Sequence, residues 1–231
     1  MPVYRLHPEL KIFPHPLNAD ATGVLAVHGE LTSERLINAY RHGIFPWYSK
    51  NEPVLWWFPD PRCVLYPENL KISKSMRSVL RNKGFDVTMN RNFSRVIQYC
   101  KETSRHGQDG SWLDDDMVRS YNQLHKEGYA HSVEVWLHGE LVGGLYGISL
   151  GKIFFGESMF SMESNASKVA FIYLVEKLRQ LDFQLIDCQQ DTEHMRSLGA
   201  TVIPAAEFYK AIRGNHVPCL ECEKLIGWDN L

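Results

Sequence analysis

The sequence of 231 residues predicts an α+β fold, with a small N-terminal domain packed on a larger domain. Residues 1–62 are rich in proline and turn residues, whereas helix-like and strand-like segments alternate regularly from residue 63 onward. Within that second part, helices precede three consecutive strands, and a helix and a strand follow, which is the order typical of α+β proteins. A chain of this length can form two unequal domains, and we expect them at residues 1–62 and 63–231.

The composition is that of an ordinary globular protein, with 44% hydrophobic and 23% charged residues. The formal net charge of −2 provides no overall attraction to nucleic acid or membrane, so any basic surface must be local. No run of eighteen apolar residues and no signal-peptide core is present, and we expect a cytoplasmic protein that binds no membrane. No exposed heptad pattern occurs, and we expect a monomer.

Five cysteines in a chain without an export signal are expected to be reduced thiols. Cys219 and Cys222 form a C-x-x-C pair, but no second pair of zinc ligands follows at the usual spacing. We therefore predict two ordinary thiols and no metal. A metal site that includes His216 is the alternative.

The N-terminal region contains one predicted helix at residues 32–42, which Thr32 or Ser33 can cap and Gly43 can end. Aromatic segments follow at residues 44–48 and 55–59. Segments this rich in aromatic side chains do not form flexible linkers, and we expect them to pack against the larger domain.

The larger region begins with a strand at 64–66, a helix at 73–83 that Gly84 ends, a strand at 85–89, and helices at 93–102 and 114–127. The three aspartates at 114–116 are predicted to cap the last of these helices. Strands at 131–136, 140–149 and 152–161 are joined by turns that suit hairpins. A long helix at 166–181, capped by Ser164 or Asn165, a strand at 184–189 and a short helix at 192–198 complete the pattern.

A basic face lies on the predicted helix at 73–83. Lys74, Arg77 and Arg81 follow one another at i, i+3 and i+7, and no acid occurs between Lys71 and Lys83. Such a stripe suits phosphate groups, although a solvated helix face is the alternative interpretation. Trp47 and Trp112 lie in turn-rich positions, where a tryptophan either stacks on a base or fills a gap between domains.

A polar cluster is predicted where two strands come together. Glu157 lies on an apolar strand, and Asp187 and Gln189 lie on the strand that follows the long helix, where their spacing places them on one face. The apolar side chains expected around them are Leu145, Phe154, Met159, Leu174 and Ile186. This composition is typical of a small-molecule pocket, whereas a carboxylate network that holds the strands in register is the alternative. Cys188 is predicted to point to the opposite face, as a core thiol.

Several runs of residues resemble the leucyl/phenylalanyl-tRNA–protein transferases. They are residues 43–47 (Gly-Ile-Phe-Pro-Trp), 56–62 (Trp-Trp-Phe-Pro-Asp-Pro-Arg), 131–136 (His-Ser-Val-Glu-Val-Trp), 156–161 (Gly-Glu-Ser-Met-Phe-Ser), 165–168 (Asn-Ala-Ser-Lys) and 185–189 (Leu-Ile-Asp-Cys-Gln). The resemblance implies a GNAT-type acyltransferase fold for the larger domain. It also implies the transfer of Leu or Phe, and less well Met, from aminoacyl-tRNA to the α-amino group of proteins that begin with Arg or Lys, which creates an N-end-rule degradation signal.

The resemblance leads to an assignment of roles. Trp47 and Trp112 hold the 3′-terminal adenosine, the five apolar residues receive the Leu or Phe side chain, and Lys74, Arg77, Arg81 and Lys83 contact tRNA phosphates. Asp187 orients Gln189, and the pair positions the incoming amine. Glu157 holds either the amino group of the donor residue or the cationic side chain of the acceptor.

Two other functions remain open at this stage. A coenzyme A-dependent acetyltransferase of the same fold would need a glycine-rich turn before the long helix, but residues 161–166 contain no glycine. We therefore expect no cofactor. A non-enzymatic RNA-binding protein would use the basic helix and the tryptophans, and would leave Glu157, Asp187 and Gln189 with a structural role only.

Overall fold

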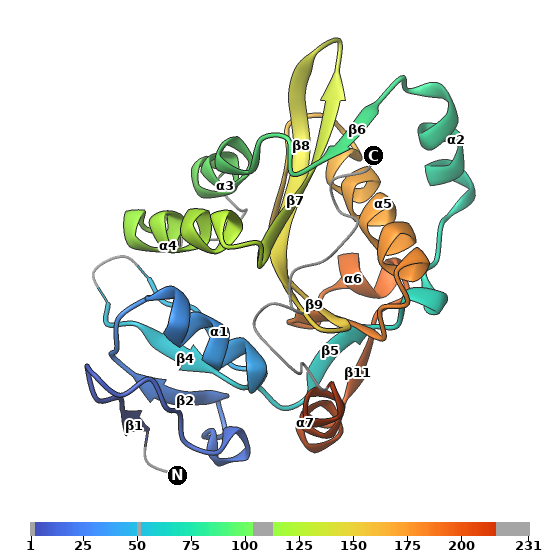
Figure 1. Ribbon diagram of the computed structural model, residues 1–231. Helices are drawn as coiled ribbons and strands as arrows, with labels where there is room; N and C mark the ends of the chain where they lie inside the picture. The colour runs from blue at the N-terminus through green and yellow to red at the C-terminus, as the bar shows by residue number, and fades with distance from the viewer. Residues whose placement is uncertain (1–2, 50–51, 104–112, 216–231) are drawn as a thin grey trace.

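The computed structural model describes residues 3–49, 52–103 and 113–215, and it contains two β-sheets with helices packed on them (Figure 1). The α+β class predicted from the sequence is thereby confirmed. The smaller sheet has the order β1-β2-β4-β3, formed by Tyr4–Arg5, Val24–Val27, Leu55–Trp57 and Phe45–Pro46. The larger sheet has the order β11-β5-β10-β9-β8-β7-β6, formed by Thr201–Ile203, Arg62–Leu65, Leu185–Gln189, Ile153–Ser161, Glu140–Leu150, Ala130–Leu137 and Asp86–Met89.

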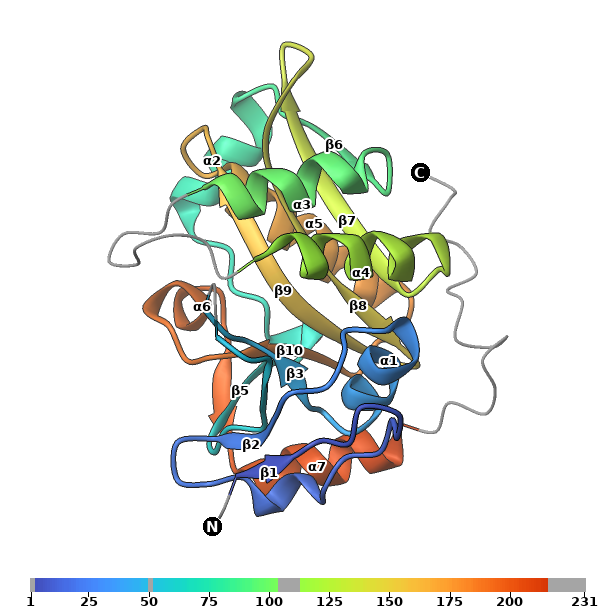
Figure 2. The same cartoon turned by 90° about the vertical axis from the view of Figure 1, so that its left-hand side faces the viewer.

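Helices cover both faces of the larger sheet. The helices are α1 (Ser33–Arg41), α2 (Lys74–Asn82), α3 (Phe93–Glu102), α4 (Asp115–Lys126), α5 (Ala166–Gln180), α6 (Glu193–Ser197) and α7 (Ala205–Gly214), with single 3-10 turns at Pro16–Asn18 and Pro67–Asn69. Helices α3 and α4 lie on one face of strands β7–β9, and α5 and α2 lie on the other (Figures 1 and 2). No helix among the residues that the structure describes is long and apolar enough to cross a membrane.

The predicted N-caps of two helices, Thr32 and an aspartate of residues 114–116, are confirmed, and Ser73 caps α2 in the same way. The side chains of Thr32, Ser73 and Asp114 each accept a hydrogen bond from the backbone N–H three residues later. Helix α5 begins differently. Its N-cap is Asn165, with φ of 71°, and this side chain makes no capping hydrogen bond, so its left-handed backbone rather than its amide suits the position.

The aromatic segment connects the two sheets. It forms β3 and β4, where Trp56 is fully buried, and Phe58 then packs against Phe208 of α7. One cluster of buried side chains extends from the smaller sheet, including Leu25, to the face of the larger sheet under α3 and α4, including Phe155. Because this core is continuous, the division into domains at residue 62 stays a prediction.

Some elements differ from the sequence prediction. The first strand of the larger sheet starts at Arg62 rather than at Val64, and β1 to β4, β11 and α7 were not predicted as elements. The strands among them are two to four residues long. Strands this short show too few alternations to be recognised, and only their pairing partners define them.

Two register shifts lie on neighbouring strands. Strands β9 and β10 pair in parallel at Ile153–Leu185, Phe154–Ile186 and Phe155–Asp187. Immediately afterwards Glu157 is the extra residue of β9 against β8, because Tyr146 pairs with Ser158 and Gly147 with Gly156. Cys188 is the extra residue of β10 against β5. The two strands therefore stop pairing at the point where both have a bulge.

Candidate active site

A cavity of about 250 Å³ lies where β9 and β10 separate, and α5, α6 and β3 complete its wall. All five apolar residues chosen from the sequence line it: Leu145, Phe154, Met159, Leu174 and Ile186. Phe45, Phe171 and Met195 add further apolar surface. The predicted convergence of strands around an apolar pocket is thus present in the structure.

The polar end of this cavity is built around Glu157. Its Oε1 atom accepts a hydrogen bond of 3.1 Å from Nε2 of Gln189, and its Oε2 atom accepts one of 2.9 Å from the hydroxyl of Tyr121. The hydroxyl of Tyr40 lies 2.5 Å from that of Tyr121. The carboxylate is therefore held by side chains from α1, α4 and β10, which come from three distant parts of the sequence.

Burial dominates the electrostatics of Glu157, of which only 8% is exposed. Desolvation raises the pKa of Glu157 from 4.5 to about 7, and the nearby charge of Asp187 adds to this. The hydrogen bonds from Tyr40, Tyr121 and Gln189 act in the opposite direction and favour the carboxylate. Glu157 can therefore exchange a proton near neutral pH, unlike an ordinary surface carboxyl group.

Asp187 is bound differently, although it also lines the cavity. Nε and Nη2 of Arg62 donate to its two carboxylate oxygens at 2.8 and 2.6 Å, and both residues are fully buried. Nη2 of Arg62 also donates to the carbonyl oxygen of Gly43 at 2.9 Å, and the guanidinium lies over the rings of Phe45 and Phe208. This charge pair therefore connects the aromatic segment to β10 and α7.

A bulge in β10 separates Asp187 from Gln189. Oδ1 of Asp187 accepts the backbone N–H of Gln189 at 2.9 Å, and Gln189 has φ of 59°. Cys188, the inserted residue, packs with Ile186 against the buried cluster under α5, as expected for a core thiol, and it also lines the cavity. Its thiol is hydrogen-bonded to Cys63, and this contact together with burial raises the pKa of Cys188, which argues against a nucleophile.

Of the two tryptophans assigned to adenosine, Trp47 lines the cavity, and its ring lies 5.3 Å from that of Trp57. Nε1 of Trp57 donates to the carbonyl oxygen of Trp47, which fixes the backbone there. Trp112 lies outside the described residues. The tail with Cys219, Cys222 and His216 does so as well.

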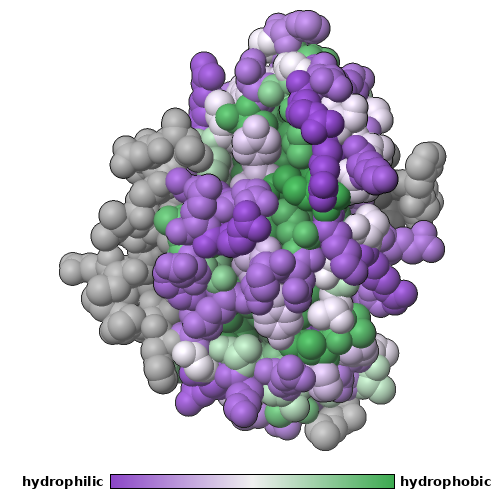
Figure 3. Space-filling model, turned by 90° about the vertical axis from the view of Figure 1, so that its right-hand side faces the viewer, coloured by the Kyte–Doolittle hydropathy of each residue, from purple (hydrophilic) through white to green (hydrophobic). Residues whose placement is uncertain are grey.

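The basic face of α2 is exposed. Lys74, Arg77 and Arg81 are exposed, and none of them forms an ion pair with another described residue, whereas Met76 is buried on the opposite side. Lys83 is different because its Nζ lies 3.2 Å from the carboxylate of Glu163. The side of the molecule that carries α2 is largely hydrophilic, with hydrophobic patches between the polar side chains (Figure 3).

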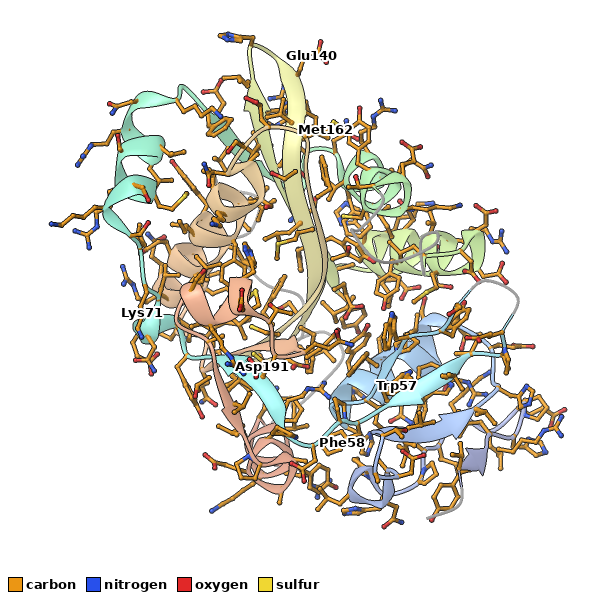
Figure 4. All side chains as sticks on the ribbon, turned by 180° about the vertical axis from the view of Figure 1, so that it is seen from behind. Trp57, Phe58, Lys71, Glu140, Met162 and Asp191 are labelled. Carbon is orange, nitrogen blue, oxygen red and sulfur yellow. The ribbon has the colours of Figure 1, made fainter. Side chains whose placement is uncertain are left out.

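The rim of the cavity connects to this helix. Gln190, Thr192 and His194 line the rim after β10, and Asp191 between them binds Arg196 of α6 (Figure 4). The carbonyl oxygen of Leu198, just after α6, accepts the backbone N–H of Lys71, just before α2. The basic helix therefore starts close to one side of the cavity.

Besides Phe45, Phe171 and Met195 of the cavity wall, sequence reasoning missed the residues that hold Glu157 and Asp187 in place: Tyr40, Tyr121 and Arg62. Arg62 stands in one of the runs quoted above, and an arginine at the start of an apolar strand was the available signal. The two tyrosines gave no signal, since each occupies an ordinary apolar position of its helix. Within the residues covered by the structure, no group of three or more His, Cys, Asp or Glu side chains is placed to hold a metal ion.

Comparison with known proteins identifies the family of this chain. The family model described as "Leucyl/phenylalanyl-tRNA protein transferase" matches residues 64–213, and the model of the N-terminal domain of that family matches residues 29–60. A leucyl/phenylalanyl-tRNA–protein transferase from Syntrophobacter fumaroxidans is 53% identical over 93% of this chain and 92% of its own length. One from Azotobacter vinelandii is 56% identical over 80% of this chain and 82% of its own length.

A solved GCN5-related N-acetyltransferase from Kribbella flavida has a TM-score of 0.36 and 10% identity, covering 73% of this chain and 59% of its own. A likeness of this degree carries no conclusion about fold or function. The sequence matches, in contrast, include strands of both sheets and the residues that line the cavity. The chain belongs to the leucyl/phenylalanyl-tRNA–protein transferase family, whose members are aminoacyltransferases.

Proposed function

We propose that this protein moves Leu or Phe, and less well Met, from aminoacyl-tRNA to the α-amino group of proteins that begin with Arg or Lys. The product would carry an N-end-rule degradation signal, and the larger sheet would be a GNAT-type acyltransferase core. One observation carries the proposal: an apolar cavity of about 250 Å³ ends at a buried carboxylate and an amide. This is somewhat smaller than drug-sized pockets of roughly 300 Å³ or more, as suits a single amino-acid side chain.

The cavity supplies the specificity for the donor. Leu145, Phe154, Met159, Leu174 and Ile186 surround the Leu or Phe side chain, and Trp47 at the rim stacks on the terminal adenosine. An apolar wall distinguishes similar side chains by size only modestly, which suits acceptance of Leu, Phe and Met together. Trp112 is proposed as the second stacking residue from the sequence alone.

The basic face of α2 binds the acceptor stem. Lys74, Arg77 and Arg81 are exposed, and the helix begins beside the rim, so phosphates can be contacted while the 3′ end enters the cavity. The sequence also suggested Lys83 as a phosphate contact. Because Lys83 forms an ion pair with Glu163, we assign it a smaller contribution to tRNA binding.

The chemical step needs little covalent assistance from the protein, because the aminoacyl ester is already activated. Asp187 fixes the backbone of Gln189, and Gln189 positions the attacking amine. Glu157 is available to hold a cationic group, either the amino group of the donor residue or the side chain of the acceptor. Holding both substrates together supplies much of the rate enhancement.

Contacts at the start of α5 argue against coenzyme A. The backbone N–H groups of Met162 and Glu163 both donate to the carbonyl oxygen of Val142, and the N–H of Ser167 donates to Oγ of Ser161. Three of the amides near the start of α5 are therefore already bound. The carboxylate of Glu163 beside them would also repel a pyrophosphate.

The test is a transfer assay with labelled leucyl-tRNA and a peptide that begins with Arg, with an N-acetylated copy of the peptide as control. Label in the free-amine peptide alone supports the proposal, and parallel reactions with Lys and Asp at the first position test acceptor specificity. Transfer from acetyl-coenzyme A would favour an acetyltransferase. Bound tRNA without any transfer would favour an RNA-binding protein.

A further inference from the structure

Glu157 lies at the end of a chain of hydrogen bonds that the transfer reaction described above leaves without a role. The phenol of Tyr40 contacts that of Tyr121, which donates to Glu157, and Gln189 donates to the other carboxylate oxygen. We infer that Glu157 accepts the proton that the attacking α-ammonium group must lose, and that Tyr121 and Tyr40 hold the carboxylate in place for it. This assignment rests on the proposed function and deepens it.

The geometry separates Glu157 from Asp187 as a proton acceptor. Both oxygens of Asp187 are bound by Arg62, and one of them also accepts the N–H of Gln189. A proton on Asp187 would leave the fully buried guanidinium without its counter-charge. Glu157 has no cationic partner among its hydrogen-bond donors, and it lines the cavity directly. The amide of Gln189 can orient an amine but does not take up its proton.

The environment of Glu157 suits this role. The titratable groups that face it are Tyr40 from α1, Tyr121 from α4 and Asp187 from β10, and Tyr146 of β8 lies against the tyrosines. Burial among them raises the pKa of Glu157 to about 7. An α-ammonium group has a pKa of about 7.7 to 8.0, so proton transfer to Glu157 is unfavourable by only about tenfold, against more than a thousandfold for an ordinary carboxylate.

The step balances without any further reactant. One proton passes from the α-ammonium group to the carboxylate of Glu157, which frees the nitrogen lone pair. That pair forms the C–N bond to the ester carbonyl carbon, and the carbonyl π electrons move to oxygen. Collapse of this intermediate breaks the bond to the 3′ oxygen, which takes a second proton from the nitrogen. Glu157 then releases its proton to solvent.

The experiment follows the carboxyl group and the reaction over the same pH range. The protonated carboxyl band of Glu157 is titrated by infrared difference spectroscopy, with Glu157→Gln to identify the band. Single-turnover transfer is measured in parallel at saturating Arg-peptide. In the wild type, the band should disappear and the rate should rise around the same pH, near 7. Glu157→Gln should lower the rate by at least about 100-fold.

Tyr121→Phe is the diagnostic variant, because it removes a hydrogen bond that favours the charged form of Glu157. Both the infrared titration and the rate profile should move to higher pH together. Tyr48→Phe is the matched control: it removes a buried phenol that donates to a carboxylate at Asp114, and neither curve should move.

Three outcomes would overturn the assignment. The first is a rate profile that does not move when the carboxyl titration does. The second is a Glu157→Gln enzyme within twofold of the wild-type rate. The third is a Glu157→Gln enzyme with a raised KM for the peptide and an unchanged rate at saturation. That result would identify Glu157 as a binding group for the acceptor. If the wild-type protein transfers no label at all, the proposed function fails first, and this assignment fails with it.

Discussion

Arg62 and Asp187 form a fully buried ion pair that joins the strand following the aromatic segment to the strand that carries Gln189. The two residues are 125 positions apart in the chain. Arg62 also donates to the carbonyl oxygen of Gly43, and Asp187 also accepts the backbone N–H of Gln189. Through this pair, the backbone conformation at the bulge of β10 depends on the packing between β3, β5 and α7.

Arg62→Met is expected to destabilise the protein strongly, because it leaves the carboxylate of Asp187 buried without a counter-charge. The loss in the free energy of unfolding should be about 3 to 5 kcal/mol, measured by urea denaturation. Asp187→Ala should have a comparable cost, so loss of activity in that variant would not by itself show a catalytic role. Arg196→Met breaks an exposed arginine–aspartate pair instead and should leave the midpoint of unfolding nearly unchanged.

Glu157→Gln should change stability in a pH-dependent way. The folded-state pKa of Glu157, about 7, lies above its ordinary value of 4.5, so the folded protein binds more protons than the unfolded chain between these pH values. Stability from this group is present at low pH and is lost as pH rises through 7. The free energy of unfolding of the variant, relative to that of wild type, should therefore rise by about 3 kcal/mol from pH 4.5 to pH 7.5. If urea denaturation gave the same difference in free energy of unfolding between variant and wild type at both pH values, the raised pKa would be contradicted.

Charge reversal on α2 should weaken tRNA binding in a salt-dependent manner. Arg77→Glu combined with Arg81→Glu is expected to lower affinity at low salt and to reduce the slope of log K against log salt by about 2. The measurement is a filter-binding titration at several salt concentrations. Arg119→Glu on α4 reverses an equally exposed charge on the opposite face of the sheet, and the slope should stay the same. An unchanged slope in the double variant would remove the basic face from the binding site.

Leu174→Phe should shift the donor preference from Phe toward Leu. Leu174 is 2% exposed and lines the cavity, so a larger side chain there fills part of the space for the donor. We expect transfer of Phe to fall at least about tenfold more than transfer of Leu, measured as the ratio of kcat/KM values. Leu178→Phe adds the same group one turn later on α5, at a buried position outside the cavity wall. Its Leu-to-Phe ratio should equal that of wild type, whatever its stability.

The sequence predicted the parts of this structure that show regular periodicity over many residues. Helices such as α3 and α5 and the three-stranded meander appear close to their predicted bounds. The five apolar residues of the cavity were found because strands that flank a crossover helix commonly pair, and β9 and β10 do. Alternation could not predict that Cys188 also lines the cavity, since β10 has an inserted residue at this point.

The partners of the polar cluster were beyond this kind of reasoning. Tyr40 meets Tyr121 across 81 residues of sequence, and Arg62 meets Asp187 across 125. The tyrosine contact leaves no trace in local composition, because a tyrosine on the apolar face of a helix packs in the same way whether or not its hydroxyl has a partner. An arginine at the start of a buried strand indicates that a partner exists but not which residue it is. Only the three-dimensional arrangement distinguishes these cases.

The long sequence separations between these contacting residues also bear on how activity is acquired during folding. The residues around Glu157 and Asp187 come from α1, β5, α4 and β10, so the site forms only after the most distant segments of the chain have met. Contacts of this kind are slow to form, since each closes a long loop. A fragment that starts at residue 63 would lack Tyr40, Phe45 and Arg62 even if it folded. Recovery of transfer during refolding should therefore coincide with the last structural phase, which makes enzymatic activity a reporter of complete folding.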